Sequence, residues 1–252
     1  MAVEKVDVIG TPLAVVNYET ALAEVLQLAK EPRATAIAAA NTHLVAEARQ
    51  TPSFHEVIKQ FDLILPDGMP LVWSMRRRGA VVADRVYGPY FMQYVLQHTP
   101  RPWKHFFFGG TEEILQMLGV AARRIQPDLD IVGTFSPPFR AWEERDHEYF
   151  AYKINLVEPD FIWVALGGVR QERWIMQNRF RFDRGVFLAV GDAFSLLAGE
   201  HPFAPPWMQK AGLTWLYRMN MEPKRLGLRY CKYNSFFIYY YLRDALFGAS
   251  GK

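Results

Sequence analysis

The sequence lacks most of the features that would place a protein in a familiar class at once. Its 252 residues include a single cysteine, Cys231, which excludes an internal disulfide and a cysteine metal cluster and is typical of a reducing compartment. No stretch approaches the roughly 18 uninterrupted apolar residues of a membrane-spanning helix. The first ten residues carry charges where a signal peptide needs an apolar run. We therefore expect a cytoplasmic protein, either soluble or peripheral to a membrane.

Motifs of several common enzyme classes are also missing. The sequence has no Gly-x-Ser-x-Gly elbow of a hydrolase, no Gly-x-Gly-x-x-Gly fingerprint and no Walker lysine. Its six histidines show no paired spacing of the kind that metal ligands have. We therefore expect neither a bound metal nor a cofactor.

Short β-rich runs alternate with helical patterns through the first 200 residues. The runs predict strands at 34–40, 61–65, 104–108, 130–134, 161–166 and 186–190. Apolar spacings of three and four predict helices between them, beginning at 42, 114, 143 and 171. This alternation indicates an α/β fold with a mainly parallel sheet covered by helices on both faces.

The character of the chain changes near residue 200. From residue 201 onward, eight residues are basic and only Glu222 and Asp244 are acidic, and Trp and Tyr are frequent. Basic segments attract phosphates, including lipid head groups and diphosphates. We expect a catalytic domain over 1–200 and a basic, aromatic-rich appendage over 201–252. Two arrangements stay open: a final helix pair packed on the α/β domain, or an amphipathic surface on an anionic membrane.

Polar residues that follow predicted strands are the candidate site residues, because ligands of parallel sheets bind beyond the carboxyl ends of the strands. Asp67, in Pro66-Asp67-Gly68, is the best candidate for a general base, since partial desolvation would raise its pKa. The alternative is a turn in which Asp67 caps backbone amides. Asn41 follows another strand, where it would contact a donor or cap a helix.

Two further strand ends offer weaker signals. Gly109 and Gly110 precede a helix and would present free amides to a phosphate, although an ordinary strand-to-helix connection explains them equally well. Gln171 opens a helix and suits a nucleobase or a sugar hydroxyl. Its neighbour Glu172 has the simpler interpretation of favouring the helix N-terminus.

Several motifs are modest alone but specific in their order and spacing. They are Asn41-Thr42-His43-Leu44-Val45, Asp62 to Trp73 (DLILPDGMPLVW), Arg85-Val86-Tyr87-Gly88-Pro89, Gly167 to Trp174 (GGVRQERW), Val190-Gly191-Asp192-Ala193-Phe194 and Glu222-Pro223-Lys224-Arg225. Over nearly the whole chain, this pattern resembles the WecG/TagA/CpsF glycosyltransferase family.

The resemblance implies a metal-independent, inverting transferase with a Rossmann-like sheet. The donor would be a UDP-sugar carrying N-acetylmannosamine, its uronic acid or glucose, and the acceptor a polyprenyl-diphosphate-linked sugar. Asp67 would be the general base, and the C-terminal appendage would meet an anionic membrane at the inner face of the plasma membrane. The implied donor-pocket residues are Asn41, Arg85 and Gln171, with Gly109 and Gly110 as phosphate candidates, and those at the diphosphate are Arg218, Arg225 and Arg229.

Three positions depart from the family pattern: Ala39 where Thr is frequent, Ser195 where Asp is usual, and Phe203 where Arg is usual. They bear on the donor sugar more than on the reaction. The segment 135–140 (FSPPFR) resembles the exopolysaccharide branch, which favours glucose.

Two other functions are compatible with parts of the sequence. A nucleotide-binding oxidoreductase would use the same α/β crevice but should show a glycine fingerprint and a later acidic residue. A non-catalytic basic membrane-binding module would explain only the appendage. We expect no nucleic-acid partner, and a homo-oligomer is left open.

Overall fold

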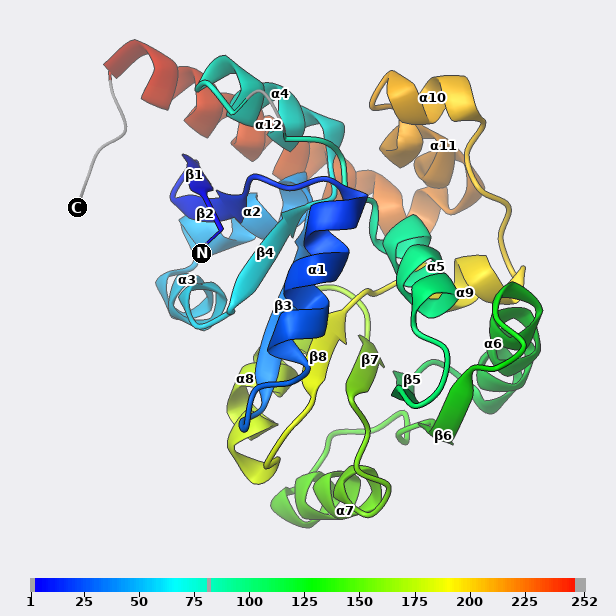
Figure 1. Ribbon diagram of the computed structural model, residues 1–252. Helices are drawn as coiled ribbons and strands as arrows, with labels where there is room; N and C mark the ends of the chain where they lie inside the picture. The colour runs from blue at the N-terminus through cyan, green and yellow to red at the C-terminus, as the bar shows by residue number, and fades with distance from the viewer. Residues whose placement is uncertain (1–2, 81–82, 248–252) are drawn as a thin grey trace.

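A six-stranded parallel sheet forms the centre of the computed structural model, which describes residues 3–80 and 83–247 (Figure 1). The strands run in the order β4-β3-β8-β7-β5-β6, and each neighbouring pair is parallel. Their bounds are β3 Thr35–Ala40, β4 Leu63–Pro66, β5 Lys104–Gly109, β6 Asp130–Phe135, β7 Phe161–Ala165 and β8 Val186–Ala189. The α/β prediction with its Rossmann-like parallel sheet is confirmed. A separate antiparallel hairpin, β1 (Lys5–Val8) and β2 (Thr11–Ala14), was not expected.

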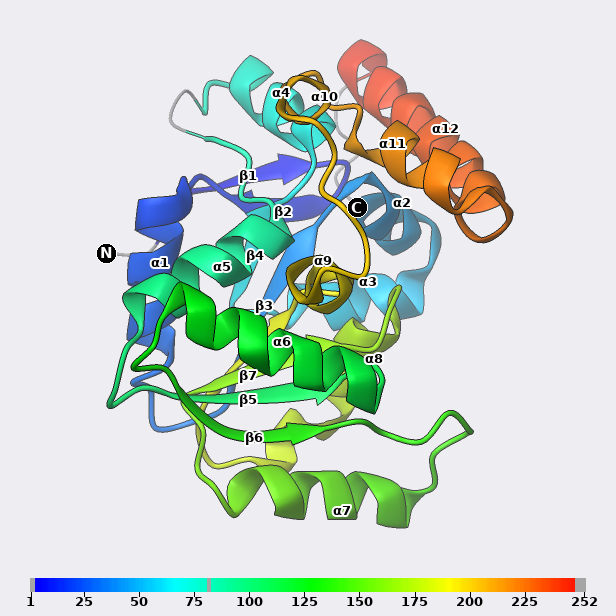
Figure 2. The ribbon, with the colours of Figure 1, turned by 90° about the vertical axis from the view of Figure 1, so that its right-hand side faces the viewer.

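Helices cover both faces of the sheet, so α6 and α7 lie on opposite sides of β5 and β6 in Figure 2. One hydrophobic cluster joins the sheet to α1 (Tyr18–Leu28), α5 (Gly88–His98), α6 (Glu112–Ile125) and α9 (Ala193–Ala198). The other joins it to α2 (Thr42–Gln50), α3 (Pro52–Lys59), α4 (Met69–Arg77), α7 (Glu144–Asn155) and α8 (Arg170–Asn178), which continues into a short 3₁₀ helix at Arg179–Arg181.

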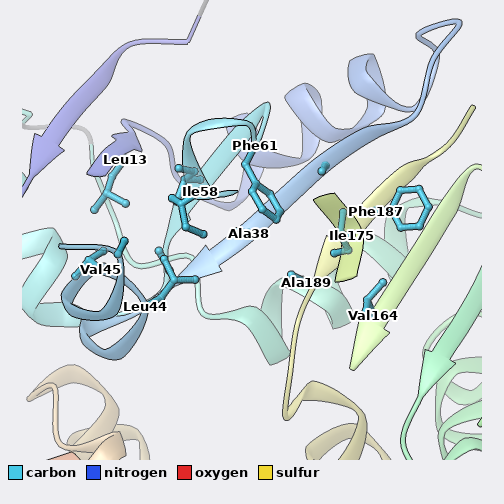
Figure 3. Close-up of a cluster of buried hydrophobic side chains, with 14 of the residues drawn as sticks. Leu13, Ala38, Leu44, Val45, Ile58, Phe61, Val164, Ile175, Phe187 and Ala189 are labelled. Carbon is cyan, nitrogen blue, oxygen red and sulfur yellow. The ribbon is translucent and has the colours of Figure 1, made fainter. Parts of the chain in front are cut away.

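Burial on both faces explains why the strands read as continuous apolar runs rather than alternating ones. Every residue of β7, FIWVA, is buried. Figure 3 shows part of the second cluster, where Ala38 of β3, Val164 of β7 and Ala189 of β8 lie near side chains of α2, α3 and α8. The small residues of β3, TAIAAA, let these helices approach the sheet closely.

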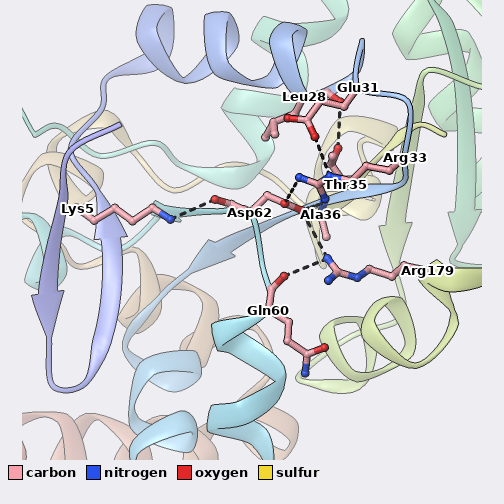
Figure 4. Close-up of polar contacts among 9 residues, drawn as sticks. All are labelled: Lys5, Leu28, Glu31, Arg33, Thr35, Ala36, Gln60, Asp62 and Arg179. Carbon is pink, nitrogen blue, oxygen red and sulfur yellow. Dashed lines mark hydrogen bonds and ion pairs between the residues drawn. The ribbon is translucent and has the colours of Figure 1, made fainter. Parts of the chain in front are cut away.

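Ion pairs fix the amino ends of the strands (Figure 4). Asp62, just before β4, accepts the backbone N–H of Ala36 at 2.8 Å and the guanidinium of Arg33 at 2.7 Å. Arg179 lies 3.6 Å from the same carboxylate. Asp160, before β7, repeats the arrangement with the Lys104 N–H at 2.9 Å. These acids therefore hold neighbouring strands in register.

The C-terminal segment folds back over the carboxyl ends of the strands as α10 (Pro206–Lys210), α11 (Thr214–Met221) and α12 (Pro223–Phe247), at the top of Figure 1. Helix α12 packs along α2: Phe237 is buried, Thr42 donates to Asn234 at 2.8 Å, and Tyr233 donates to Glu47 at 2.5 Å.

The outer side of α12 carries exposed apolar residues, among them Leu228, Tyr239 and Leu242. The two arrangements weighed for the appendage thus concern different faces of one helix, one packed and one exposed. Within 3–80 and 83–247, no helix combines the length and apolar character needed to span a bilayer. Lys252 of the basic segment and the first two residues lie outside the described residues.

Candidate active site

A cavity of about 590 Å³ opens at the carboxyl ends of β4, β3, β8 and β7, beneath α4, α11 and α12. Its position is the one expected for ligand binding in a parallel sheet. The cavity brings together most of the residues singled out from the sequence, although they are far apart along the chain. Those that line it are Asn41, Asp67, Arg85, Gln171, Arg218, Arg225 and Arg229.

Gly109 and Gly110 do not belong to this set. They end β5, which lies beyond β7 in the sheet and is separated from β3 by two strands. A Cβ atom at Gly109, whose φ is +117°, would overlap the Ala165 carbonyl, whereas Gly110 has room for a Cβ but a φ of +72°. Close backbone packing accounts for glycine at 109 and the left-handed backbone for glycine at 110, and Phe194 of α9 lies next to the turn.

Asp67 lies at the end of β4 with its carboxylate at the cavity, 14% exposed. It does not cap its own turn: Gly68 is the N-cap of α4 and no side chain provides the cap hydrogen bond. Instead the carboxylate faces the start of α5, where the Gly88 backbone lowers its pKa. Arg85 binds the backbone oxygen of Asp67 through Nε at 2.6 Å, while its Nη2 lies 3.7 Å from Oδ1.

Burial raises the pKa of Asp67 to about 6, against the opposing influence of Arg85 and, further away, Arg218. Removal from water disfavours the charged form of a carboxyl group more than the single nearby cation favours it. A carboxylate with a pKa near 6 is ionised at neutral pH and basic enough to accept a proton from a hydroxyl group in a transition state.

Arg85 is itself fixed from several sides. Its guanidinium stacks on the Tyr87 ring, with the central carbon 4.1 Å from the ring centroid, and Nη1 donates to Thr214 on α11 at 3.2 Å. The residue therefore links β4 to the C-terminal helices. It presents a cation to the cavity beside the proposed base.

Asn41 is the N-cap of α2, and its Oδ1 accepts the Leu44 N–H at 3.1 Å. The capping interpretation of Asn41 is therefore correct for its side-chain oxygen. Asn41 is nevertheless exposed and lines the cavity, so its amide nitrogen is available to a ligand.

Gln171 and Glu172 form a buried pair at the start of α8. Gln171 Nε2 donates to Glu172 Oε1 at 2.9 Å, while Gln171 Oε1 and Glu172 Oε2 are buried without a partner in the described protein. Burial raises the pKa of Glu172 to about 7, opposed mainly by the hydrogen bond from Gln171. Since buried polar atoms nearly always have partners, two orphaned oxygens at a cavity point to a polar ligand. Glu172 is thus more than the helix-terminus residue expected from the sequence.

The three predicted C-terminal arginines differ in their partners. Arg218 pairs with Asp192 at 2.7 Å, and Arg225 pairs with Glu222 at 2.5 Å. Arg229 Nε is buried and has no hydrogen-bond partner in the described part of the chain. A buried guanidinium N–H without an acceptor is costly, so Arg229 is suited to hold an anion that enters the cavity.

Sequence reasoning missed several residues of the site. Asp192 stands in the Val190-Gly191-Asp192-Ala193-Phe194 motif, but its pairing with Arg218 depends on how α11 folds back. Tyr87 and Trp73 belong to motifs noted in the sequence, but neither they nor Trp215 were singled out as site residues, and all three line the cavity.

An Asp-x-Asp triplet, Asp128 and Asp130, was overlooked in the sequence. It lies at the start of β6, at the amino end of the sheet, away from the cavity. Among the described residues no three His, Cys, Asp or Glu side chains form a group that could hold a metal ion.

Comparison with known proteins agrees with this geometry. The family described as "Glycosyl transferase WecG/TagA/CpsF family" matches residues 6–251. The chain is 28% identical over 193 residues to the N-acetylglucosaminyldiphosphoundecaprenol N-acetyl-beta-D-mannosaminyltransferase of Staphylococcus aureus (strain MW2), covering 76% of this chain and 74% of the relative. A protein of the same name from Bacillus spizizenii is 29% identical over 190 residues, or 75% and 72% of the two chains. Since the family match spans nearly all of the sequence, the chain belongs to the WecG/TagA/CpsF family and is a glycosyltransferase.

Proposed function

We propose that this glycosyltransferase is an inverting enzyme that moves a sugar from a UDP-sugar to a polyprenyl-diphosphate-linked sugar in bacterial surface or exopolysaccharide synthesis. The observation that carries the proposal is Asp67, a buried carboxylate with a raised pKa at the edge of a cavity lined by cations. The names of the relatives supply the acceptor chemistry, a sugar on diphosphoundecaprenol, and the formation of a β linkage.

In the proposed reaction the acceptor hydroxyl attacks the anomeric carbon of the donor while Asp67 takes its proton. The new carbon–oxygen bond forms as the bond to the UDP phosphate breaks, so the two electrons of the broken bond leave with UDP. A single displacement on an α-linked donor gives a β product, which agrees with the linkage in the relatives' names. Above about pH 6 Asp67 is ionised, and its nearest cation, Arg85, lies 3.7 Å from the carboxylate. The carboxylate can therefore accept the proton of the hydroxyl group.

The leaving diphosphate needs positive charge that is already in place. Arg85 lies beside Asp67, and Arg218, Arg225 and Arg229 reach the same cavity from α11 and α12. Arg218 and Arg225 already have acidic partners, so a diphosphate would share or replace them. Asn41 and Gln171 remain the proposed polar contacts to the donor.

We also propose that the exposed side of α12 contacts the membrane that holds the acceptor. Leu228, Tyr239, Leu242 and Leu246 are exposed at helical spacing along α12. Basic residues interspersed along the same segment suit an anionic surface, and apolar side chains next to them suit the interfacial region.

A direct test is incubation of the purified protein with UDP-N-acetylmannosamine, its uronic acid and UDP-glucose, each with a short-chain prenyl-diphosphate-linked N-acetylglucosamine. Mass spectrometry of the lipid product reads the added mass and identifies the donor. The names of the relatives favour N-acetylmannosamine, whereas the segment 135–140 favours glucose. No added sugar from any of the donors would contradict the proposal.

A further inference from the structure

Glu172, at the start of α8, is a buried acid at the cavity that has no part in the proposed displacement. It is 2% exposed, its neighbour Gln171 is 5% exposed, and both line the cavity. Gly167 and Gly168 precede them with φ values of +75° and +53°, which lets the chain turn from the end of β7 directly into the helix. The pair therefore lies on the sheet side of the cavity, at the end of a strand.

The hydrogen bond within the pair fixes the orientation of the Gln171 amide. Only the amide nitrogen can donate to a carboxylate oxygen, and Gln171 Nε2 lies 2.9 Å from Glu172 Oε1. The amide oxygen of Gln171 is thereby turned away from Glu172. Gln171 Oε1 and Glu172 Oε2 are buried without a partner among residues 3–80 and 83–247. When Glu172 is ionised, the pair thus presents two hydrogen-bond acceptors to a ligand.

The carboxyl end of β8 places this pair beside the proposed base. A Cβ atom at Gly191 would lie 3.6 Å from Gln171 Nε2 and 3.7 Å from its Oε1, so the amide lies next to Gly191. A Cβ atom at Gly88 would lie 3.5 Å from Asp67 Oδ2 and 3.8 Å from the carbonyl oxygen of Val190. The Gln171 amide and the Asp67 carboxylate thus flank two consecutive residues of one backbone segment.

Two acceptor oxygens select a ligand group that donates hydrogen bonds. A diphosphate does not suit them, because its oxygens are themselves negatively charged acceptors. Burial raises the pKa of Glu172 to about 7, and no basic side chain is among the groups that oppose this shift. The uracil ring of UDP has a single N–H flanked by two carbonyl oxygens, so it would satisfy one orphaned oxygen and oppose the other. Hydroxyl groups of a sugar satisfy both.

Position distinguishes among the sugars of the reaction. The ribose of UDP is separated from the anomeric carbon by the diphosphate, whereas Gln171 lies close to Asp67, where the new bond forms. The lipid-linked sugar would come from the membrane on the side of α12, whereas Gln171 and Glu172 lie on the sheet side. The sugar that is transferred fits both conditions.

We infer that Glu172 is a specificity-determining residue for the donor, which forms with Gln171 a single two-oxygen site for hydroxyl groups of the transferred sugar. Glu172 holds the Gln171 amide with its oxygen toward the sugar and supplies the second oxygen itself. A sugar ring held here lies next to Asp67, so its anomeric carbon is positioned for attack by the hydroxyl group that Asp67 deprotonates. This inference rests on the proposed function, because the UDP-sugar comes from there.

Binding of the donor without any lipid-linked sugar tests this site separately from transfer. We would measure the affinity of the full chain for UDP, UDP-glucose and UDP-N-acetylmannosamine by calorimetry. For the UDP-sugar that binds more tightly, Glu172→Gln should weaken binding about tenfold or more, because hydrogen bonds to a charged group contribute on that order. Affinity for UDP should stay within about twofold, since the pair does not touch the nucleotide. An equal loss for UDP and the UDP-sugar would overturn the inference, and so would an unchanged affinity for the UDP-sugar.

A double-mutant cycle separates one joint site from two independent contacts. Gln171→Ala should also weaken binding of the UDP-sugar about tenfold or more. Adding Glu172→Gln to Gln171→Ala should change the affinity by no more than about threefold, because residues that act as a unit are not additive. Gln177→Ala is the matched control, since Gln177 is exposed on the same helix and does not line the cavity. Losses that multiply in the double variant would overturn the inference.

A purely structural role for Glu172 predicts a different pattern. Glu172→Gln keeps the shape of the side chain and removes a buried charge, so its resistance to urea should not fall below that of the natural chain. A loss of stability without a sugar-specific loss of affinity would overturn the inference. If the sugar-specific loss is found but no sugar reaches a lipid-linked sugar, the proposed transfer fails and the donor site stands.

Discussion

The two ends of the parallel sheet carry acidic residues in contrasting situations. Asp62, at the amino end, and Asp67, at the carboxyl end of the same short strand, are almost equally accessible, with 15% and 14% of their side chains exposed. Asp62 has a backbone N–H at 2.8 Å and Arg33 at 2.7 Å, whereas the cation nearest to Asp67 is Arg85, 3.7 Å away. Equal burial with unequal pairing separates a carboxylate that holds strands together from one that remains free to take a proton.

Charges at the carboxyl end as a whole are less completely paired. Glu172 has an orphaned oxygen and Arg229 an orphaned N–H, while Asp160 at the amino end has both a backbone donor and Arg184. Burial without full pairing costs stability, so it is tolerated where a ligand completes the interactions. Incompletely paired charges thus gather at the carboxyl end of the sheet, where the cavity lies.

The largest expected effect comes from removing the more weakly paired carboxylate, Asp67. Asp67→Asn should lower kcat by about 100- to 10,000-fold, because a general base contributes on that order. Affinity for UDP should change less than about threefold, since the amide keeps the shape of the carboxylate. Product formation and UDP binding measured on the same preparation check both statements. A variant that keeps more than a tenth of the activity would contradict the role of Asp67.

The next effect is a displaced pH profile. Asp67 has to lose its proton to act, so kcat/KM should rise with pH through about 6. Arg85 lowers the pKa of Asp67, and Arg85→Gln should therefore move this acid limb upward by roughly one pH unit or more.

Arg85→Lys is the matched control for the pH profile, because it keeps the cation and should leave the limb near its original position. Both variants will lose activity through weaker donor binding, so the position of the limb, and not its height, is the readout. An acid limb that stays in place in Arg85→Gln would remove Asp67 as the titrating group.

Replacing Asp62, the well-paired carboxylate at the amino end of β4, should lower stability and leave turnover unchanged. Asp62→Asn removes the ion pairs to Arg33 and Arg179 but keeps an oxygen for the Ala36 N–H. We expect the free energy of unfolding to fall by about 1–2 kcal/mol, with kcat unchanged. Urea denaturation and a turnover assay check the pair of results. If Asp62→Asn lost as much turnover as Asp67→Asn, the contrast between a structural carboxylate at the amino end and a catalytic one at the carboxyl end would be wrong.

The last effect is one on the pH dependence of stability and concerns Glu172, whose folded-state pKa of about 7 exceeds its ordinary value of 4.5. Between these pH values the folded protein binds more protons at this site than the unfolded chain, so its contribution to stability is lost as pH rises through 7. Glu172→Gln cannot titrate. Its free energy of unfolding should exceed that of the natural protein by about 3 kcal/mol near pH 8.5 and differ less near pH 5. Parallel stability–pH curves would contradict the raised pKa.

Sequence patterns predicted the six strands of the sheet to within two residues at each end, because continuous apolar runs flanked by glycine, proline or polar residues have few other interpretations. They did not predict the β1–β2 hairpin. Its turn places Ile9 at φ +49° as well as Gly10 at +91°, and a β-branched residue is not a turn signal.

For the candidate site, the sequence predicted which residues follow strands, but not which of these strands are neighbours in the sheet. Asp67, Asn41 and Gln171 follow strands that the sheet order happens to place together, and this order cannot be read from one segment at a time. Gly109 also stands at the end of a predicted strand. That strand, β5, pairs with the side of β7 that faces away from β8, so it does not border the cavity. Glu172 is buried because of how α8 packs, and Arg218 meets Asp192 because of how α11 packs. Neither feature can be predicted from the residues next to it in the sequence.

The cavity walls come from residues as distant as Ala39 and Tyr241. During synthesis the sheet strands emerge from the ribosome well before α12, so the cavity gains this wall only after every strand of the sheet has been made. A chain cut short before α12 would lack one wall of the cavity even with its sheet assembled. Enclosure of the cavity therefore waits for a helix that follows the whole sheet in the sequence.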